Sequence, residues 1–260
     1  MCHRRREHLV GATSIPADEL EARLLELPPP FAKPVTIVGN EEELRSAREL
    51  LTRKGWRIDV ETACVDGWRA ETEVGSRSAQ AWRANDFLEF CMERYLLPFI
   101  SERGGEMSGP ALDLGCGSGR DTVYMAQRLP PGARVVGVDN HSYALERGAR
   151  LAEQWRRSCK WLLTDLRKPG SLEGLKADVI HGHRFKCEQL LPLLRDQVLL
   201  PGGFFIWSTF LDTGIEKNYV PPWRPSRMLR PGELAHIFSG DDFEILQDEA
   251  GELPTRGSTV

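Results

Sequence analysis

The sequence lacks the long apolar runs that a membrane protein needs. No such run in its 260 residues approaches the ~20 residues of a membrane-spanning helix. The N-terminal segment Met1–His8 is basic, but no apolar segment follows it, so the pattern does not predict a secretory signal. We therefore expect no membrane partner and a cytoplasmic location.

Paired cysteines and an excess of positive charge are also missing. The six cysteines are scattered without a Cys-x-x-Cys pair, which predicts reduced thiols and no metal site. The net charge of −4 disfavours a nucleic-acid partner. The hydrophobic content of 41% and charged content of 28% are typical of a globular protein.

What the sequence does contain is a strand, a glycine turn and a helix over residues 111–126. Gly115, Gly117 and Gly119 alternate just after the apolar run that includes Asp113. Because glycine has no Cβ, the turn can be sharp and a ligand can lie against bare backbone. The free N–H groups of the following helix point towards such a ligand.

Two classes of cofactor use a turn of this kind. The dinucleotide fingerprint places its third glycine where this sequence has Arg120, so a nicotinamide oxidoreductase is disfavoured. Gly-x-Gly-x-Gly after an acidic residue resembles motif I of class I S-adenosylmethionine (SAM) methyltransferases. Asp113 also suits a cationic ligand better than a pyrophosphate. The resemblance implies SAM as the cofactor.

Later positions extend this resemblance. Asp139 ends a strand-like segment, where a carboxylate accepts ribose hydroxyl groups. The resemblance implies that Asp165 contacts the adenine amino group, and Pro201-Gly202-Gly203 resembles the turn that opens the family's fifth strand. The alternative is that the two acids only cap helices or begin loops. The cofactor-binding residues that we predict are Asp113, Gly115, Gly117, Gly119, Arg120, Asp139, Asn140, Asp165, Leu166 and His181.

From residue 111 onwards, strand and helix patterns alternate, which predicts a Rossmann-like α/β fold with a doubly wound, mostly parallel sheet. A helix from Asn85 to Pro98 precedes this region. The pattern predicts a truncated last strand, because few residues after Gly251 can pair, and an open sheet edge favours a homodimer. The predicted strands are 111–114, 134–139, 159–164, 178–182, 203–209 and 243–247, with helices near 120–129, 142–156, 188–199 and 231–239.

The N-terminal part has its own α/β pattern: a helix at 16–27, strands at 35–38 and 58–60, and a helix at 41–54. Residues 8–16 resemble the His-Ile-Pro-Gly-Ala-x-x-Ile-Pro motif of rhodanese-like domains. The family's nucleophilic cysteine, which follows the strand at 35–38, is missing, because Gly39 and an acidic segment occupy that position. We predict a degenerate rhodanese-like segment (1–66), a linker (67–84) and a methyltransferase domain (85–260). The alternative for residues 1–66 is a plain α/β extension that is unrelated to rhodaneses.

Residues for catalysis cluster at the end of the fourth predicted strand. His183 can act as a general base, and Arg184 can orient an anionic acceptor through its planar fork. The alternative is that a histidine here is structural. We predict that Trp82, Arg83 and Phe210 contact the substrate, although Trp82 can instead be a core residue and Arg83 a solvated one.

These patterns predict methyl transfer to a small-molecule acceptor. Residues 120–126 resemble methyltransferases of the tellurite-resistance type, which implies a thiol or a chalcogen oxyanion as acceptor. A SAM-binding pseudoenzyme with a rhodanese-like interaction module is the alternative. An RNA methyltransferase is disfavoured, because the N-terminal segment is acidic at residues 41–43.

Overall fold

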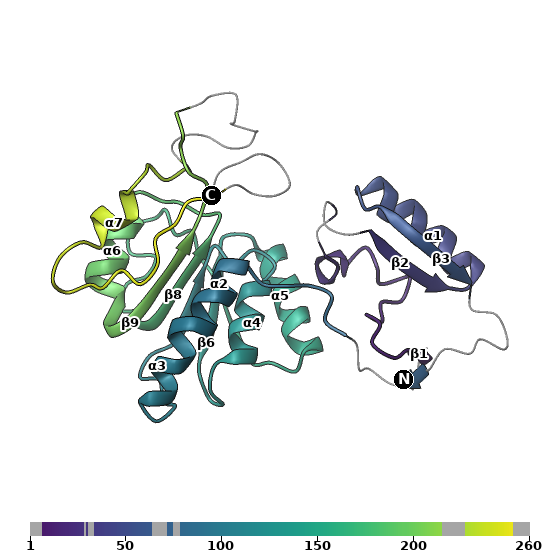
Figure 1. Cartoon of the computed structure of the whole chain (residues 1–260), viewed down its shortest axis with the longest axis horizontal. Coiled ribbons are helices and arrows are strands. Elements are labelled where there is room, and N and C mark those ends of the chain that lie inside the picture. The colour runs from purple at the N-terminus through teal and green to yellow at the C-terminus, as the bar shows by residue number, and fades with distance from the viewer. Residues whose placement is uncertain are drawn as a thin grey trace. The chain divides into compact units, whose positions relative to one another are not determined.

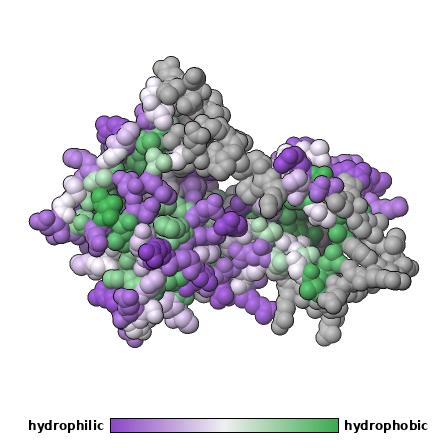
Figure 2. Space-filling view, in the orientation of Figure 1, coloured by the Kyte–Doolittle hydropathy of each residue, from purple (hydrophilic) through white to green (hydrophobic). Residues whose placement is uncertain are grey.

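A computed structural model describes residues 7–28, 30, 34–63, 72–74, 79–214 and 227–251. The chain divides into two compact units, Met1–Arg83 and Ala84–Val260, which are drawn in Figure 1. No helix of the described part is long and apolar enough to cross a membrane. On the face drawn in Figure 2, hydrophilic residues cover most of the coloured surface.

The second unit is built on a five-stranded sheet with the strand order β7-β6-β5-β8-β9, in which all neighbours are parallel. The chain order reverses between β5 and β8, so the carboxyl ends of these two strands form a switch point. This confirms the predicted Rossmann-like fold. The strands are β5 (Ala111–Leu114), β6 (Val135–Asp139), β7 (Lys160–Leu163), β8 (Ala177–His183) and β9 (Leu199–Ser208).

Helices follow most of these strands, as the sequence predicts, and the segment between β7 and β8 forms turns. In Figure 1, α4 and α5 lie beside β6, while α6 and α7 lie on the side of β8 and β9. The crossovers of a parallel sheet place helices on both of its faces. The helices are α4 (Arg120–Arg128), α5 (Ser142–Gln154), α6 (Leu190–Leu193) with its π-helical continuation η3 (Leu194–Val198), and α7 (Glu233–Ile237).

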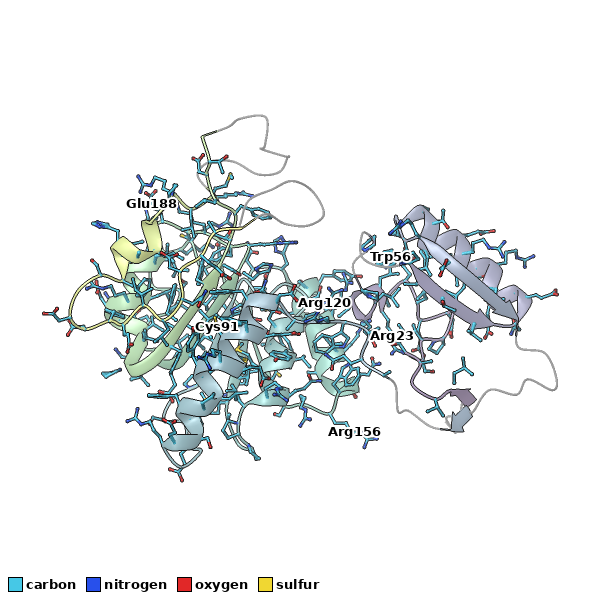
Figure 3. All side chains as sticks on the ribbon, viewed as in Figure 1. Arg23, Trp56, Cys91, Arg120, Arg156 and Glu188 are labelled. Carbon is cyan, nitrogen blue, oxygen red and sulfur yellow. The ribbon has the colours of Figure 1, made fainter. Side chains whose placement is uncertain are left out.

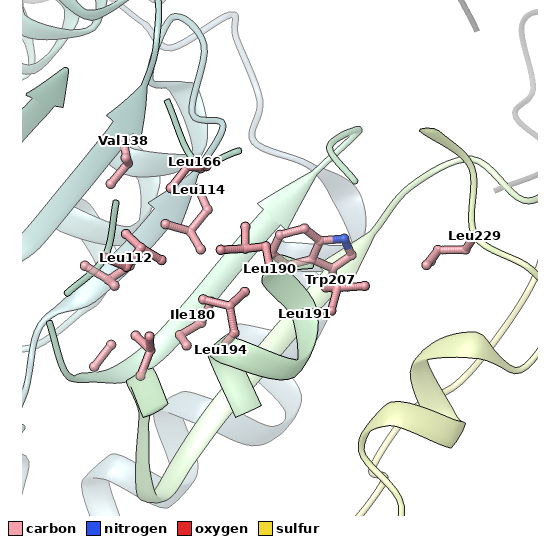
Figure 4. Packing of buried hydrophobic residues seen from close by; sticks show 13 residues of the cluster. Leu112, Leu114, Val138, Leu166, Ile180, Leu190, Leu191, Leu194, Trp207 and Leu229 are labelled. Atoms are coloured by element: carbon pink, nitrogen blue, oxygen red, sulfur yellow. The ribbon is translucent and has the colours of Figure 1, made fainter. Parts of the chain in front are cut away.

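The core of this unit lies between α6 and the sheet. Leu191 and Leu194 are fully buried and pack near Ile180 and Trp207 (Figure 4). Burying one such side chain contributes about 1.5–3 kcal/mol. This packing holds the carboxyl end of β8 in place, where the catalytic residues are predicted.

The helix that enters this unit is longer than predicted. It runs through α2 (Asp86–Cys91), the π-helical turn η2 (Met92–Leu96) and α3 (Leu97–Glu102), so the prediction that Pro98 ends it is wrong. The N–H of Leu97 donates to the carbonyl of Met92 at the end of the π-helical turn η2. Pro98 therefore lies in the first turn of the next helical segment, α3. A proline is tolerated there, because its missing N–H needs no partner.

Two predicted elements are absent from the described residues. Residues 243–247 form no strand: Ile245 and Leu246 are 51% and 41% exposed, and no neighbouring strand pairs with them. Residues 16–27 form turns and one short 3-10 helix, η1 (Leu24–Glu26), instead of an α-helix. Leu20 and Leu25 are buried but five residues apart, which is not a helical repeat. The predicted truncated last strand lies outside the described residues.

The first unit contains two small sheets. Strand β2 (Val35–Gly39) pairs in parallel with β3 (Ile58–Ala63), and α1 (Glu41–Arg53) connects them with the predicted capping box at its start. Strand β1 (Glu7–Leu9) pairs with β4 (Thr72–Val74), so part of the predicted linker 67–84 belongs to a sheet instead. The rhodanese-like character of residues 1–66 stays a prediction.

Candidate cofactor and acceptor site

The glycine turn is tied to the neighbouring strand. Gly115 N–H and Cys116 N–H both donate to the carbonyl of Val138, at 2.8 and 3.0 Å. Gly115, Gly117 and Gly119 all have left-handed backbones, with φ of 74°, 53° and 75°. This conformation suits glycine, because a Cβ would be strained there.

Only one of these glycines faces open space. A Cβ on Gly117 would meet nothing within 4 Å, whereas a Cβ on Gly115 would lie 3.0 Å from Phe185. A Cβ on Gly119 would lie 2.5 Å from the ring of Trp161. A ligand can therefore approach the backbone at Gly117, while the other two glycines are also required for packing.

Trp161 is a feature that the sequence reasoning missed. Its ring fills a space lined by Gly119, Gly137 and Gly148, where added Cβ atoms would lie 2.5–2.7 Å away. Gly119 is the N-cap of α4, and the other two glycines come from β6 and α5, so the indole fixes how both helices sit on the sheet. In dinucleotide-binding folds, the third glycine of the motif lets the helix pack closely on the strand. In this structure, the ring of Trp161 lies at that contact and packs against the three glycines. Arg120 follows directly at the start of α4 (Figure 3).

Asp139 lies at the carboxyl end of β6, beside the glycine turn. Its two carboxylate oxygens accept hydrogen bonds from Gly117 N–H at 2.9 Å and from His141 N–H at 3.0 Å. Oδ1 also lies 3.1 Å from Nδ1 of His141 and, with the amide of Asn140 turned, 3.3 Å from its nitrogen. A carboxylate oxygen has about two acceptor positions, so Oδ2, which accepts from Gly117, keeps one for a ribose hydroxyl group. The structure therefore fits the ribose-binding role predicted for this residue.

Asp165 lies after β7 and is already engaged by a neighbour. Arg167 donates to it from Nε at 2.8 Å and from a terminal nitrogen at 2.9 Å. These hydrogen bonds hold the pKa of the Asp165 carboxyl below its ordinary value. When the side-chain amide of Asn140 is oriented so that its oxygen and nitrogen both find partners, the oxygen accepts a hydrogen bond from Arg167 at 3.2 Å. Arg167, which the sequence analysis missed, thus connects two of the predicted cofactor residues.

Two other predicted cofactor residues lie behind the site. Asp113 is 2% exposed and accepts a hydrogen bond from the Thr122 hydroxyl at 2.5 Å. Burial raises the pKa of Asp113 to about 6, although the charge of His181 acts against this. Leu166 is 6% exposed and belongs to the hydrophobic core. Both residues are buried in this structure, and their predicted contact with a cofactor stays a prediction.

His181 is also buried, and both of its ring nitrogens have partners. Nε2 lies 3.0 Å from a carboxylate oxygen of Asp121, and Nδ1 lies 3.2 Å from the carbonyl oxygen of Ile206. Both partners can only accept, so both ring nitrogens must donate and the ring is an imidazolium. Burial lowers the pKa of His181, but Asp121 outweighs this and the pKa is raised. In this structure His181 is held in an ion pair with Asp121, and its contact with a cofactor stays a prediction.

Asp121 connects this ion pair to the entry helix. Its second carboxylate oxygen accepts the backbone N–H of Asn85 at 2.8 Å. The Asn85 side chain in turn accepts from Leu88 N–H and so caps α2, as predicted. The start of α2, the start of α4 and the end of β8 are thereby fixed to one another.

The predicted catalytic pair lies where β8 ends. His183 Nδ1 is 2.8 Å from the hydroxyl of Ser208 and 3.1 Å from the side-chain nitrogen of Asn85. Burial lowers the pKa of His183 to about 4, so the ring is neutral at pH 7. A neutral imidazole can accept a proton, which a base requires. Ser208 and Asn85 are site residues that motif reasoning could not find, because they are far away in sequence.

Arg184 and Phe210 lie close together beside this pair. The Arg184 guanidinium carbon is 5.6 Å from the centre of the Phe210 ring, a cation–π distance. Arg184 N–H donates to the Ser208 carbonyl at 2.9 Å, and its backbone is left-handed with φ of 53°. Phe210 is 5% exposed, so it supports the arginine. Trp82 is 1% exposed, which agrees with the packing alternative; substrate roles for Trp82 and Arg83 stay predictions.

The sequence profile of a methyltransferase domain matches residues 111–203. The chain is 29% identical over 165 residues to trans-aconitate 2-methyltransferase from Azoarcus sp. (strain BH72), covering 61% of this chain and 60% of that protein. It is 32% identical over 112 residues to an uncharacterized 37.1 kDa protein in transposon Tn4556 of Streptomyces fradiae, covering 42% and 31% of the two. The chain thus spans less than two thirds of either relative.

Solved structures with a loose likeness include TehB from Haemophilus influenzae, with a TM-score of 0.43 and 17% identity over 65% of this chain and 60% of that one. The plantazolicin methyltransferase BpumL, in a complex with S-adenosylhomocysteine, gives a TM-score of 0.40 and 20% identity over 58% and 55%. By its strand order, the second unit has a Rossmann-like fold. Residues 111–203 of this unit carry the sequence pattern of a methyltransferase domain.

Proposed function

We propose that this chain transfers a methyl group from SAM to a small, negatively charged acceptor. The observation that carries the proposal is the glycine turn with its open space at Gly117 and with Asp139 bonded to the same residue. This cradle lies at the switch point of a parallel sheet, and residues 111–203 match the methyltransferase profile.

The residues present suit SAM. Asp139 would hold the ribose hydroxyl groups, the bare backbone at Gly117 would lie against the ligand, and the partly exposed carboxylate of Asp165 would receive the adenine amino group. When bound, SAM supplies an electrophilic methyl group on a sulfonium. The protein's part is then to hold an acceptor in line with that group and to exclude water.

The acceptor end supports an anionic substrate. Arg184 supplies a planar cation, and the face of Phe210 holds it in place. His183 is neutral at pH 7 and can take a proton from an acceptor that is not yet ionised. A thiolate or a chalcogen oxyanion fits this arrangement, and so does a carboxylate such as the trans-aconitate after which one relative is named.

The experiment is methyl transfer from labelled SAM to a panel that contains a thiol, selenite, tellurite and trans-aconitate. We expect one class of acceptor to be labelled, and labelling to be lost in Arg184→Ala while SAM binding persists. A protein that binds SAM but labels no acceptor would be the pseudoenzyme instead. A protein that binds no SAM would contradict the cofactor assignment itself.

A further inference from the structure

We propose that Ser208 and Asn85 are positioning residues that hold His183 with its proton on Nδ1 and leave Nε2 as the acceptor. This inference rests on the proposed function only where turnover is concerned, because the position of the proton is a property of the protein alone. It deepens that function by naming the atom of His183 that takes the proton.

The proton positions follow from which groups can donate. Ser208 has one hydroxyl proton and two possible partners: Nδ1 of His183 at 2.8 Å and the side-chain oxygen of Asn85 at 3.4 Å. The oxygen of Asn85 can only accept. If the hydroxyl donates to Asn85, Nδ1–H of His183 donates to Ser208 and both contacts are satisfied. The opposite assignment leaves the oxygen of Asn85 without the serine proton.

The amide of Asn85 has a fixed orientation. Its oxygen accepts the N–H of Leu88, so its nitrogen must face His183. That nitrogen is 3.1 Å from Nδ1 and 3.4 Å from Nε2. If the amide nitrogen of Asn85 lay on the lone-pair axis of one ring nitrogen, its distance to the other ring nitrogen would be much longer than this. The amide therefore packs against the ring and does not occupy the lone pair of Nε2.

The electrostatic surroundings of His183 link it to the neighbouring ion pair. Burial lowers the pKa of His183 to about 4 and outweighs the attraction of Asp121. The charged groups that act on the ring are Asp121, Arg184 and His181. Asp121 also accepts the backbone N–H of Asn85, so the His181–Asp121 ion pair fixes the residue that orients His183.

The consequence is a directed proton transfer. The bond between the acceptor heteroatom and its hydrogen breaks, the proton binds Nε2, and the electron pair stays on the acceptor. The resulting imidazolium keeps its Nδ1–H bond to Ser208 and later releases the Nε2 proton to water. With the opposite tautomer, His183 would present an N–H and could not act as this base.

The test is NMR of protein with ¹⁵N-labelled histidine, in which protonated and unprotonated ring nitrogens are distinguished at pH 7. The resonances of His183 are assigned as those missing from His183→Gln. We expect a protonated Nδ1 and an unprotonated Nε2 in the wild type. Ser208→Ala should shift the population towards Nε2–H, and Ser208→Thr, which keeps the hydroxyl, should restore it. Ser239→Ala is the matched control, because its hydroxyl donates to a nearby backbone carbonyl, that of His236, away from His183 in the sequence.

Turnover gives the second measurement. We expect Ser208→Ala to lower kcat at least about tenfold with an unchanged Kd for SAM, since a positioned base contributes roughly 10²–10⁴. Asn85→Asp keeps the helix cap. Its carboxylate beside the ring should raise the pKa of His183, so the acidic limb of the profile of kcat against pH should move to higher pH. A wild-type ring protonated on Nε2, or a tautomer unmoved in Ser208→Ala, overturns the proposal. Absence of turnover on any acceptor contradicts the proposed function alone.

Discussion

The two ends of the site are built in different ways. At the cofactor end, the bare backbone at Gly117 borders open space, and the residue lies beside Asp139 of β6. At the acceptor end, a partly buried network of Asp121, His181, Asn85, His183 and Ser208 surrounds the fully buried ring of His181. The cofactor end is therefore local in sequence, and the acceptor end depends on contacts between distant elements.

The largest effect is expected where that network is most buried. Asp121→Ala leaves the imidazolium of His181 buried and unpaired, and breaking a buried ion pair costs about 3–5 kcal/mol. Urea unfolding should show a loss of this size. Asp196→Ala is the control, because its ion pair with Arg195 is largely exposed and such pairs contribute about 0–1 kcal/mol. Equal losses in the two variants would contradict the contrast.

At the cofactor end, we expect effects on binding instead of folding. Asp139→Ala removes a charged acceptor of ribose hydroxyl groups and should weaken SAM binding by roughly 1.5–3 kcal/mol, measured by calorimetry. Its melting temperature should change much less than that of Asp121→Ala. A variant that binds SAM as tightly as the wild type would show that the ribose lies elsewhere.

Two glycines of the same turn should also separate effects on stability from effects on SAM binding. Gly119→Ala places a Cβ 2.5 Å from Trp161 and should destabilise the fold by about 1–3 kcal/mol through overpacking. Gly117→Ala meets no neighbour, so it should cost only the backbone strain of about 1–2 kcal/mol and mainly lower SAM affinity. Thermal melts and calorimetry of both variants measure this. The opposite ranking would mean that Gly117 is not the ligand-facing glycine.

The smallest effect is a pH dependence of stability at the acceptor end. The pKa of His181 is raised in the folded protein, so its contribution is complete below the unfolded value of about 6.5 and is lost as pH rises through the folded pKa. Asp121 acts oppositely: its lowered pKa gives stability above about pH 3.9 that is lost in acid. The stability difference between wild type and His181→Gln should therefore shrink as pH rises above neutral. A constant difference would mean that His181 is not an imidazolium.

The same contrast explains how far the sequence could predict the structure. The strands β5 and β6, the glycine turn and Asp139 are marked by apolar runs and spacing within a short stretch, and the structure places them as expected. The partners of His181 and His183 are Asn85 at the N-cap of α2, Asp121 in α4 and Ser208 in β9, at sequence separations of 98, 60 and 25 residues. No local pattern in the sequence indicates such pairings.

The misassigned elements have a related cause. Residues 243–247 have an apolar pattern, but a strand also needs a hydrogen-bonding neighbour, and the described residues offer none there. The hydrophobicity of residues 159–164 correctly predicts a strand that contains Trp161, but the packing role of its ring depends on three glycines from other segments. Patterns predict which segments are buried, and tertiary contacts decide what they pair with.

The central claim is that the cradle between Gly117 and Asp139 binds SAM. Calorimetric titration of the full chain with SAM, and separately with NADH, tests it directly. We predict saturable SAM binding in the micromolar range, lost or greatly weakened in Asp139→Ala, and no binding of NADH. Tight NADH binding without SAM binding would contradict the account.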